Sequence, residues 1–107
     1  MAKVLTINTV GNVQEVENRI TIALTAQSVT AGGAIGTDYI YLCTGTCTIT
    51  LPSAVGNFNK YTIKNTTGTD TINTTSLQTI DGSTSIQLLV ENQSVDIISN
   101  TTNWLII

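Results

Sequence analysis

Cys43 and Cys47 are the residues of this 107-residue chain whose type and spacing come nearest to those of a redox or metal-binding pair. They flank Thr44-Gly45-Thr46, a segment of the kind that joins the two strands of a β-hairpin. We therefore expect the two side chains to face each other across a hairpin, as free thiols or as a disulfide, and a reducing cytoplasm favours the thiols. Without a further Cys or His, this spacing does not complete a zinc site, so we predict no metal.

The other residue types that carry catalysis give no constellation. The sequence has no histidine, which excludes Ser-His-Asp and Cys-His catalysis. Asp38, Asp70 and Asp81 lie in or beside expected turns, where Asp bonds nearby backbone, and nothing in their spacing indicates a glycosidase pair. The glycine-rich stretch at 32–36 lacks the lysine and helix of a phosphate-binding loop. We therefore predict no enzyme, no catalytic residues and no cofactor.

Charge and hydropathy limit the partners. The formal net charge is −3, and the four basic residues are scattered along the chain, whereas a nucleic-acid interface needs them clustered. No apolar run approaches the roughly 20 residues that span a bilayer. The N-terminus lacks the apolar core of a signal peptide. We expect no nucleic-acid binding, no membrane insertion, and assembly in a cytoplasm.

The elements that would position any site are short strands. Around residues 48–65, apolar side chains alternate with threonine and lysine, and Pro52 ends the first of two strand-like runs. Strands are expected at residues 3–9, 19–25, 38–43, 47–51, 60–65, 70–74, 84–90, 94–99 and 104–107. Residues 13–18 are compatible with a single helical turn. Short strands at this turn spacing predict an all-β fold, a small antiparallel β-sandwich or β-prism.

Two heptapeptides echo each other. Thr44-Gly-Thr-Cys-Thr-Ile-Thr50 resembles Thr67-Gly-Thr-Asp-Thr-Ile-Asn73, with the Gly-containing turn at the same place. Either two hairpins share an ancestor, or Thr-Gly-Thr simply makes a favourable turn. The match alone leaves both explanations open.

The small residues at 26–37 suggest a loop that separates two parts of the chain. We predict an N-terminal segment, residues 1–37, that docks to a larger particle, and a β-rich body, residues 38–107. The alternative is that the first strands complete the same sandwich as the body.

Several strands are apolar on both faces, although one face of an antiparallel sheet usually meets water. Charged residues make up only 10% of the chain and apolar ones 41%, which is typical of a surface covered by other subunits. We therefore predict a homotrimer. The candidate subunit interface consists of Ile40, Leu42, Leu89, Leu105 and Ile107.

From residue 38 to residue 107 the chain resembles a small β domain of bacteriophage tail-fibre, head-fibre and other virion proteins. The matching pieces are Thr48-Ile-Thr-Leu-Pro-Ser-Ala, Tyr61-Thr-Ile-Lys-Asn, Thr79-Ile-Asp-Gly-Ser and Asn103-Trp-Leu-Ile-Ile. The resemblance implies a non-enzymatic, usually trimeric module located in the virion, whose partners are capsid or tail proteins. The short chain favours a capsid decoration (cement) protein or a short head or tail fibre. The alternative is a tail tip that binds a receptor or a host-surface glycan, which would expose Tyr39, Tyr41 or Trp104.

Overall fold

The computed structural model describes the backbone of residues 3–7 and 13–107, and the side chains from residue 18 onward. Every regular element in these ranges is a β-strand, which confirms the all-β prediction. The strands are β1 (Lys3–Ile7), β2 (Val13–Glu17), β3 (Arg19–Thr25), β4 (Ser28–Thr30), β5 (Asp38–Thr44), β6 (Cys47–Thr50), β7 (Lys60–Thr67), β8 (Asp70–Asn73), β9 (Ser85–Leu88), β10 (Ser94–Ser99) and β11 (Trp104–Ile106).

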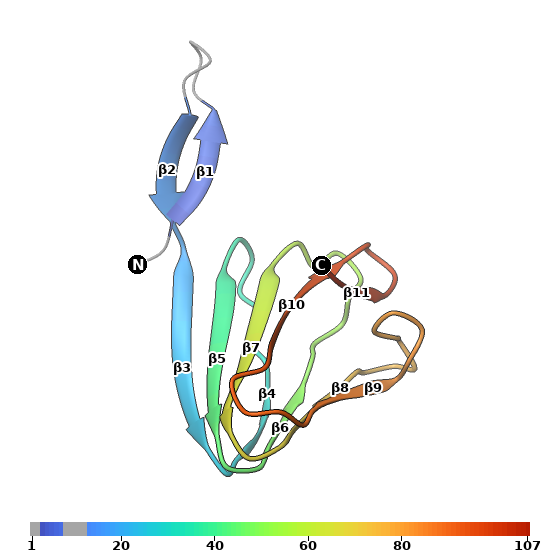
Figure 1. The fold of residues 1–107 in the computed structure, drawn as a ribbon. Helices are drawn as coiled ribbons and strands as arrows, with labels where there is room; N and C mark the ends of the chain where they lie inside the picture. Colours follow the sequence, from blue (N-terminus) through green and yellow to red (C-terminus); the bar gives the residue numbers. More distant parts are fainter. Residues whose placement is uncertain (1–2, 8–12) are drawn as a thin grey trace.

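The body of the molecule consists of two mixed sheets. One has the order β11-β10-β7-β5-β3 and the other the order β4-β6-β8-β9. Strands β3, β5 and β7 run parallel, as do β4, β6 and β8, while β9, β10 and β11 pair antiparallel. The predicted antiparallel architecture is therefore wrong for the first part of the body. The turns there carry the chain into the opposite sheet instead of back along the same one (Figure 1).

The parallel strands form successive coils, and each coil contributes one strand to each of the two sheets. The coils are β3 with β4, β5 with β6, and β7 with β8. The two echoing heptapeptides lie in neighbouring coils, because Cys47 pairs with Asp70 and Ile49 with Ile72. The Thr-Gly-Thr segments of the two peptides are equivalent turns, which we call corners, at which the chain passes from one sheet to the other. The expected hairpin at Thr44-Gly45-Thr46 is such a corner, so the cysteines do not face each other across paired strands.

The core lies between the two sheets and is built on a row of aromatic rings. Tyr39 stacks on Tyr61 with ring centroids 5.5 Å apart, and Tyr61 meets Trp104 edge-on at 5.4 Å. The opposite sheet contributes fully buried aliphatic side chains such as Ile49 and Ile72. Stacked and edge-on aromatic pairs add stability beyond the area they bury, so this row anchors the five-stranded sheet.

The tyrosines also fix the loop between β4 and β5. The Tyr41 hydroxyl accepts a hydrogen bond from the Gly32 N–H at 2.8 Å, and the Tyr39 hydroxyl accepts one from the Ala34 N–H at 3.0 Å. The Tyr61 hydroxyl donates to the Gly32 carbonyl at 2.6 Å. The stretch that appeared to be a free linker in the sequence is thus held by three side chains from two neighbouring coils.

Part of the segment formed by residues 1–37 lies within the sheets of the body. Strands β3 and β4 belong to the two sheets of the body, and β4 lies inside the segment expected to be a loop. Strands β1 and β2 pair only with each other among the described residues and project from the body as a hairpin (Figure 1). Residues 13–17 form a strand and no helical turn, and the expected strand end at 8–9 lies outside the described residues.

Candidate functional site

Four of the five predicted interface residues, Ile40, Leu42, Leu105 and Ile107, lie on the outer face of the five-stranded sheet. Ile40 and Leu42 alternate along β5 with buried residues, so they point away from the core. Leu105 follows the buried Trp104 on β11 and pairs with Ile98, which pairs in turn with the outward-facing Lys60 of β7. Leu42 is 36% exposed and Leu105 37%, so large apolar side chains are accessible on this face.

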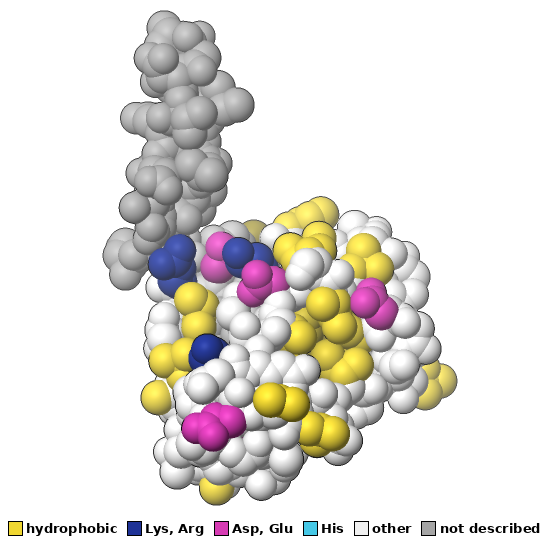
Figure 2. Space-filling model, in the orientation of Figure 1, with side chains coloured by type: hydrophobic (Ala, Val, Ile, Leu, Met, Phe, Trp, Pro, Cys, Tyr) yellow, Lys and Arg dark blue, Asp and Glu magenta, His cyan; other side chains and the backbone are white. Residues whose placement is uncertain are grey.

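The apolar residues of this face form two strips. The β5 strip consists of Ala23, Ile40 and Leu42, and the β11 strip consists of Ile98, Leu105 and Ile107. Between the strips, β7 presents the outward side chains of Lys60, Thr62 and Lys64. The space-filling view shows apolar side chains in separate groups among polar ones (Figure 2).

The fifth predicted residue, Leu89, is apart from both strips. It lies in the turn between β9 and β10 and is 59% exposed. Its backbone N–H donates to the Gln93 side chain at 3.1 Å, which fixes this turn internally. The structure thus groups Ile40, Leu42, Leu105 and Ile107 on one face and leaves Leu89 off it, while their role as an interface stays a prediction.

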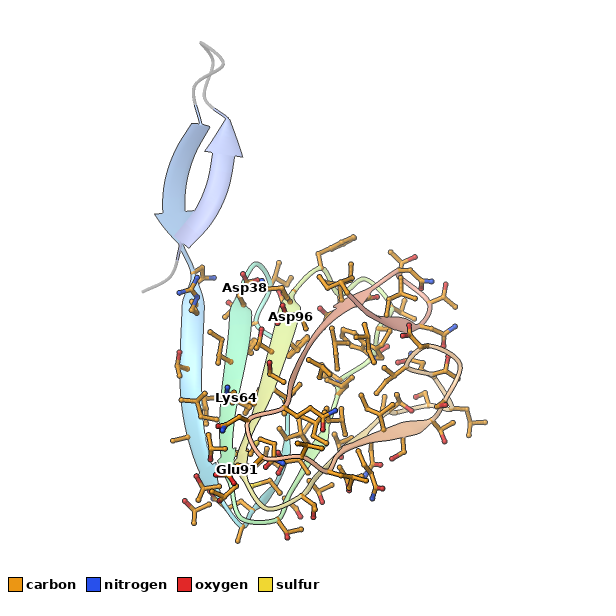
Figure 3. The ribbon with its side chains drawn as sticks, viewed as in Figure 1. Asp38, Lys64, Glu91 and Asp96 are labelled. Carbon is orange, nitrogen blue, oxygen red and sulfur yellow. The ribbon has the colours of Figure 1, made fainter. Side chains whose placement is uncertain are left out.

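Charged groups on the outer face lie toward its two ends. Asp38 and Asp96 are near the end closer to the β1–β2 hairpin, whereas Lys64 and Glu91 are nearer the opposite end (Figure 3). Asp96 accepts a hydrogen bond from the Thr62 hydroxyl at 2.6 Å. This bond leaves one of its carboxylate oxygens for an external donor.

The aromatic residues required for a glycan-binding tip are not on the surface. Tyr39 is 5% exposed, Tyr41 2% and Trp104 0%. The alternative of a glycan-binding tip required one of them on an outer loop, and this condition is not met, because all three build the core. The exposed aromatic side chain is Phe58, which lines a shallow hollow together with Ile35 and Val55.

A second cluster lies inside the corner that follows β5. Cys43, Cys47 and Asp70 are 0%, 0% and 1% exposed, and their sulfur and carboxylate oxygen atoms lie within 4.8 Å of one another. The cysteines are free thiols. Asp70 reaches the cluster because β8 stacks parallel on β6, with Asp70 beside Cys47. Three strands therefore bring two thiols and one carboxyl group together in the core.

The immediate surroundings of the cluster leave polar atoms without partners. The Cys47 N–H donates to Asp70 Oδ1 at 3.3 Å, and the Cys47 thiol donates to the Thr44 carbonyl at 3.6 Å. Asp70 Oδ2 has no hydrogen-bond partner, and neither has Oδ1 of Asn65, a buried residue paired with Cys43. Burial raises the pKa of Asp70, and burial together with Asp70 raises the pKa of Cys43 to about 12.

Asp70 is the member of this cluster that could not be placed there from the sequence pattern alone. It was expected to serve a turn by bonding nearby backbone, but it begins β8 and points into the core. The available signal was the heptapeptide echo, in which Asp70 stands at the position of Cys47. Once the two peptides are understood as stacked coils, this equivalence places the carboxyl group beside the thiol.

Comparison of the chain with protein-family models and with curated protein sequences finds no match. Within the described ranges, no helix has the length and apolarity needed to cross a membrane.

Proposed function

We propose that the protein is a non-enzymatic structural component of a bacteriophage virion, a capsid decoration protein or a short head or tail fibre, which acts as a homotrimer. The observation that carries this proposal is the outer face of the five-stranded sheet. Parallel strands occur almost only in sheets that are covered on both faces. Here β3, β5 and β7 are covered by the core on one face, while Ile40 and Leu42 are accessible on the other.

The division of the outer face into two strips supports a closed ring. In a cyclic trimer each contact is heterologous, so one surface of a subunit meets a different surface of its neighbour. The β5 strip and the β11 strip are two such surfaces on a single sheet. If three sheets face a common axis, the β5 strip of one copy packs on the β11 strip of the next.

The resemblance to virion β domains is the reason for assigning the protein to a virion. The residues that carry this resemblance help to build the core. Each of the four matching pieces contributes a fully buried side chain, among them Ile49, Tyr61, Ile80 and Trp104. The last two pieces lie side by side, because the Trp104 N–H donates to the Thr79 carbonyl at 2.7 Å. The motifs thus specify the core of the body, as expected of residues that define a fold.

The Leu105→Asp variant is expected to dissociate the trimer. A carboxylate placed in a contact between subunits loses hydration without gaining a partner, which should weaken association by about 100-fold or more. Sedimentation should then give a mass near that of one 11.3 kDa chain, against three times that mass for the unchanged protein. Leu77→Asp is the matched control, because Leu77 is 91% exposed in a loop outside the five-stranded sheet.

A monomeric unchanged protein at micromolar concentration would contradict the trimer. So would a Leu105→Asp variant that remains folded and keeps the trimeric mass. Labelling of purified phage particles with an antibody against the protein tests the virion assignment separately, and unlabelled particles would overturn it.

We propose further that the N-terminal docking function resides in the hairpin rather than in the whole of residues 1–37. A chain lacking residues 1–17 should remain a folded trimer that no longer binds its particle, because β1 and β2 pair only with each other among the described residues. A chain lacking residues 1–30 should unfold, because β5 and β6 would each lose a parallel neighbour. Circular dichroism and particle co-sedimentation measure the two effects, and full particle binding without residues 1–17 would refute the assignment.

A further inference from the structure

We propose that Cys43, Cys47 and Asp70 form a zinc-binding site inside the corner shared by two stacked coils. The proposal rests on these three buried residues and is independent of the virion function. Residues far apart in the chain meet here only because the coils stack in parallel register.

The donor set and its spacing fit zinc. Two thiolate sulfurs with one carboxylate oxygen are ligands that zinc accepts in tetrahedral sites, whereas magnesium and calcium prefer oxygen alone. Zinc–sulfur and zinc–oxygen bonds of about 2.3 and 2.1 Å place tetrahedral ligand atoms about 3.6–3.8 Å apart. The three donor atoms already lie within 4.8 Å of one another, so small side-chain rotations would bring them to bonding distance.

An independent observation points to a ligand at this place. Asp70 is 1% exposed, and its Oδ2 has no hydrogen-bond partner, although its Oδ1 accepts from the Cys47 N–H. A buried carboxylate is normally paired with a cation or coordinates a metal. The backbone N–H orients the carboxyl group, as hydrogen bonds to metal ligands commonly do.

Asn65, the neighbour of Cys43 on β7, is a second buried residue with a polar atom that has no partner. It is fully buried and pairs with Cys43 across β5 and β7. Its side-chain N–H groups donate to the carbonyls of Gly68 and Val90 at 2.7 and 3.1 Å, which fixes the amide orientation. Its Oδ1 has no hydrogen-bond partner and so has a lone pair available for coordination.

The charge balance of the corner also favours a cation. The basic residues whose side chains the structure describes are Arg19, Lys60 and Lys64, all on strands of the five-stranded sheet. Each is at least partly accessible to solvent, whereas the carboxyl group of Asp70 is buried. When zinc binds, the two thiol protons and any proton on Asp70 leave to solvent. Two thiolates and one carboxylate then face a divalent ion, and no redox step is involved.

The test measures metal uptake by the full-length protein after it has been reduced and treated with a chelator. We expect one zinc ion per chain by elemental analysis and a rise in Tm of about 10–20 °C at a zinc concentration 100-fold above Kd. With Co²⁺ in place of zinc, the bound ion should show thiolate-to-cobalt charge-transfer absorption. This signal reports cysteine coordination directly.

Two variants and a control make the test specific. Asp70→Asn should lose at least 90% of the zinc-induced Tm shift, while its metal-free Tm should not fall below that of the unchanged protein, because it removes an unpaired buried carboxylate. Cys47→Ala should lose the cobalt absorption. Glu91→Gln, at an exposed carboxylate, should keep both signals.

The proposal is overturned if the reduced protein takes up no zinc, or if the Asp70→Asn variant binds zinc as the unchanged protein does. Should Cys47→Ala fail to fold, the Asp70→Asn comparison still decides between these outcomes.

Discussion

The Gly68→Ala variant is expected to lose about 2–5 kcal/mol of unfolding free energy, because it places a methyl group where two coils touch. Gly68 has φ of +84°, and a Cβ added there would lie 2.5 Å from the Gly45 carbonyl oxygen. The left-handed backbone costs an alanine about 1–2 kcal/mol. The clash adds about 1–3 kcal/mol, because its partner is backbone that cannot rotate away.

Gly82→Ala is the matched control for this prediction. Gly82 has φ of +90°, yet nothing lies within 4 Å of the Cβ that would be added. Its loss should therefore be limited to the backbone cost of about 1–2 kcal/mol. Urea denaturation of both variants measures the difference, and equal losses would show that the corners of the two coils are not in close contact.

The Trp104→Ala variant should lose about 3–5 kcal/mol, the usual cost of removing a buried aromatic side chain. Trp104 is fully buried and packs edge-on against Tyr61 at 5.4 Å. Its backbone also joins the C-terminal strand to the turn at Asp81, because its carbonyl accepts a hydrogen bond from the Asp81 N–H at 3.0 Å. The cavity left by the indole would therefore lie where the C-terminal strand joins the core.

Trp104→Phe separates packing from hydrogen bonding in the same position. The indole Nε1 is buried without a partner, so a phenyl ring removes an unsatisfied donor while it keeps the edge-on contact. We expect a loss of only about 1–2 kcal/mol in thermal or urea unfolding. A loss as large as that of Trp104→Ala would mean that Nε1 has a partner, such as an ordered water molecule.

The positions of most body strands could be predicted from sequence because core-facing apolar residues recur at every second position, although several strands are apolar on both faces. Their pairing could not, because the same period of two serves parallel and antiparallel neighbours alike. Strand β4 could not be predicted because it is short and has Val29 as its one large apolar residue. The corner before β4 could not be predicted either, because Ala26 has the positive φ that glycine has at Gly45 and Gly68, and no glycine marks the turn.

The outer face was predicted more fully than the buried cluster. The outward orientation of Ile40 and Leu42 follows from local alternation with the buried tyrosines of the same strand. The meeting of Cys47 and Asp70 depends on a contact between residues 23 positions apart. No local pattern specifies such a contact, and only the echo between the two heptapeptides pointed to it.

The stack of coils has two unlike ends. At one end, β9, β10 and β11 pair antiparallel with their neighbours, and β9 and β11 are the outermost strands there. At the other end, β3 and β4 are the outermost strands of their sheets within the described chain, so one coil presents two rows of backbone N–H and C=O groups without a strand partner. Duplication of a coil ahead of β5 would lengthen the stack by one layer without disturbing the antiparallel end, which offers evolution a simple way to change the length of this fold.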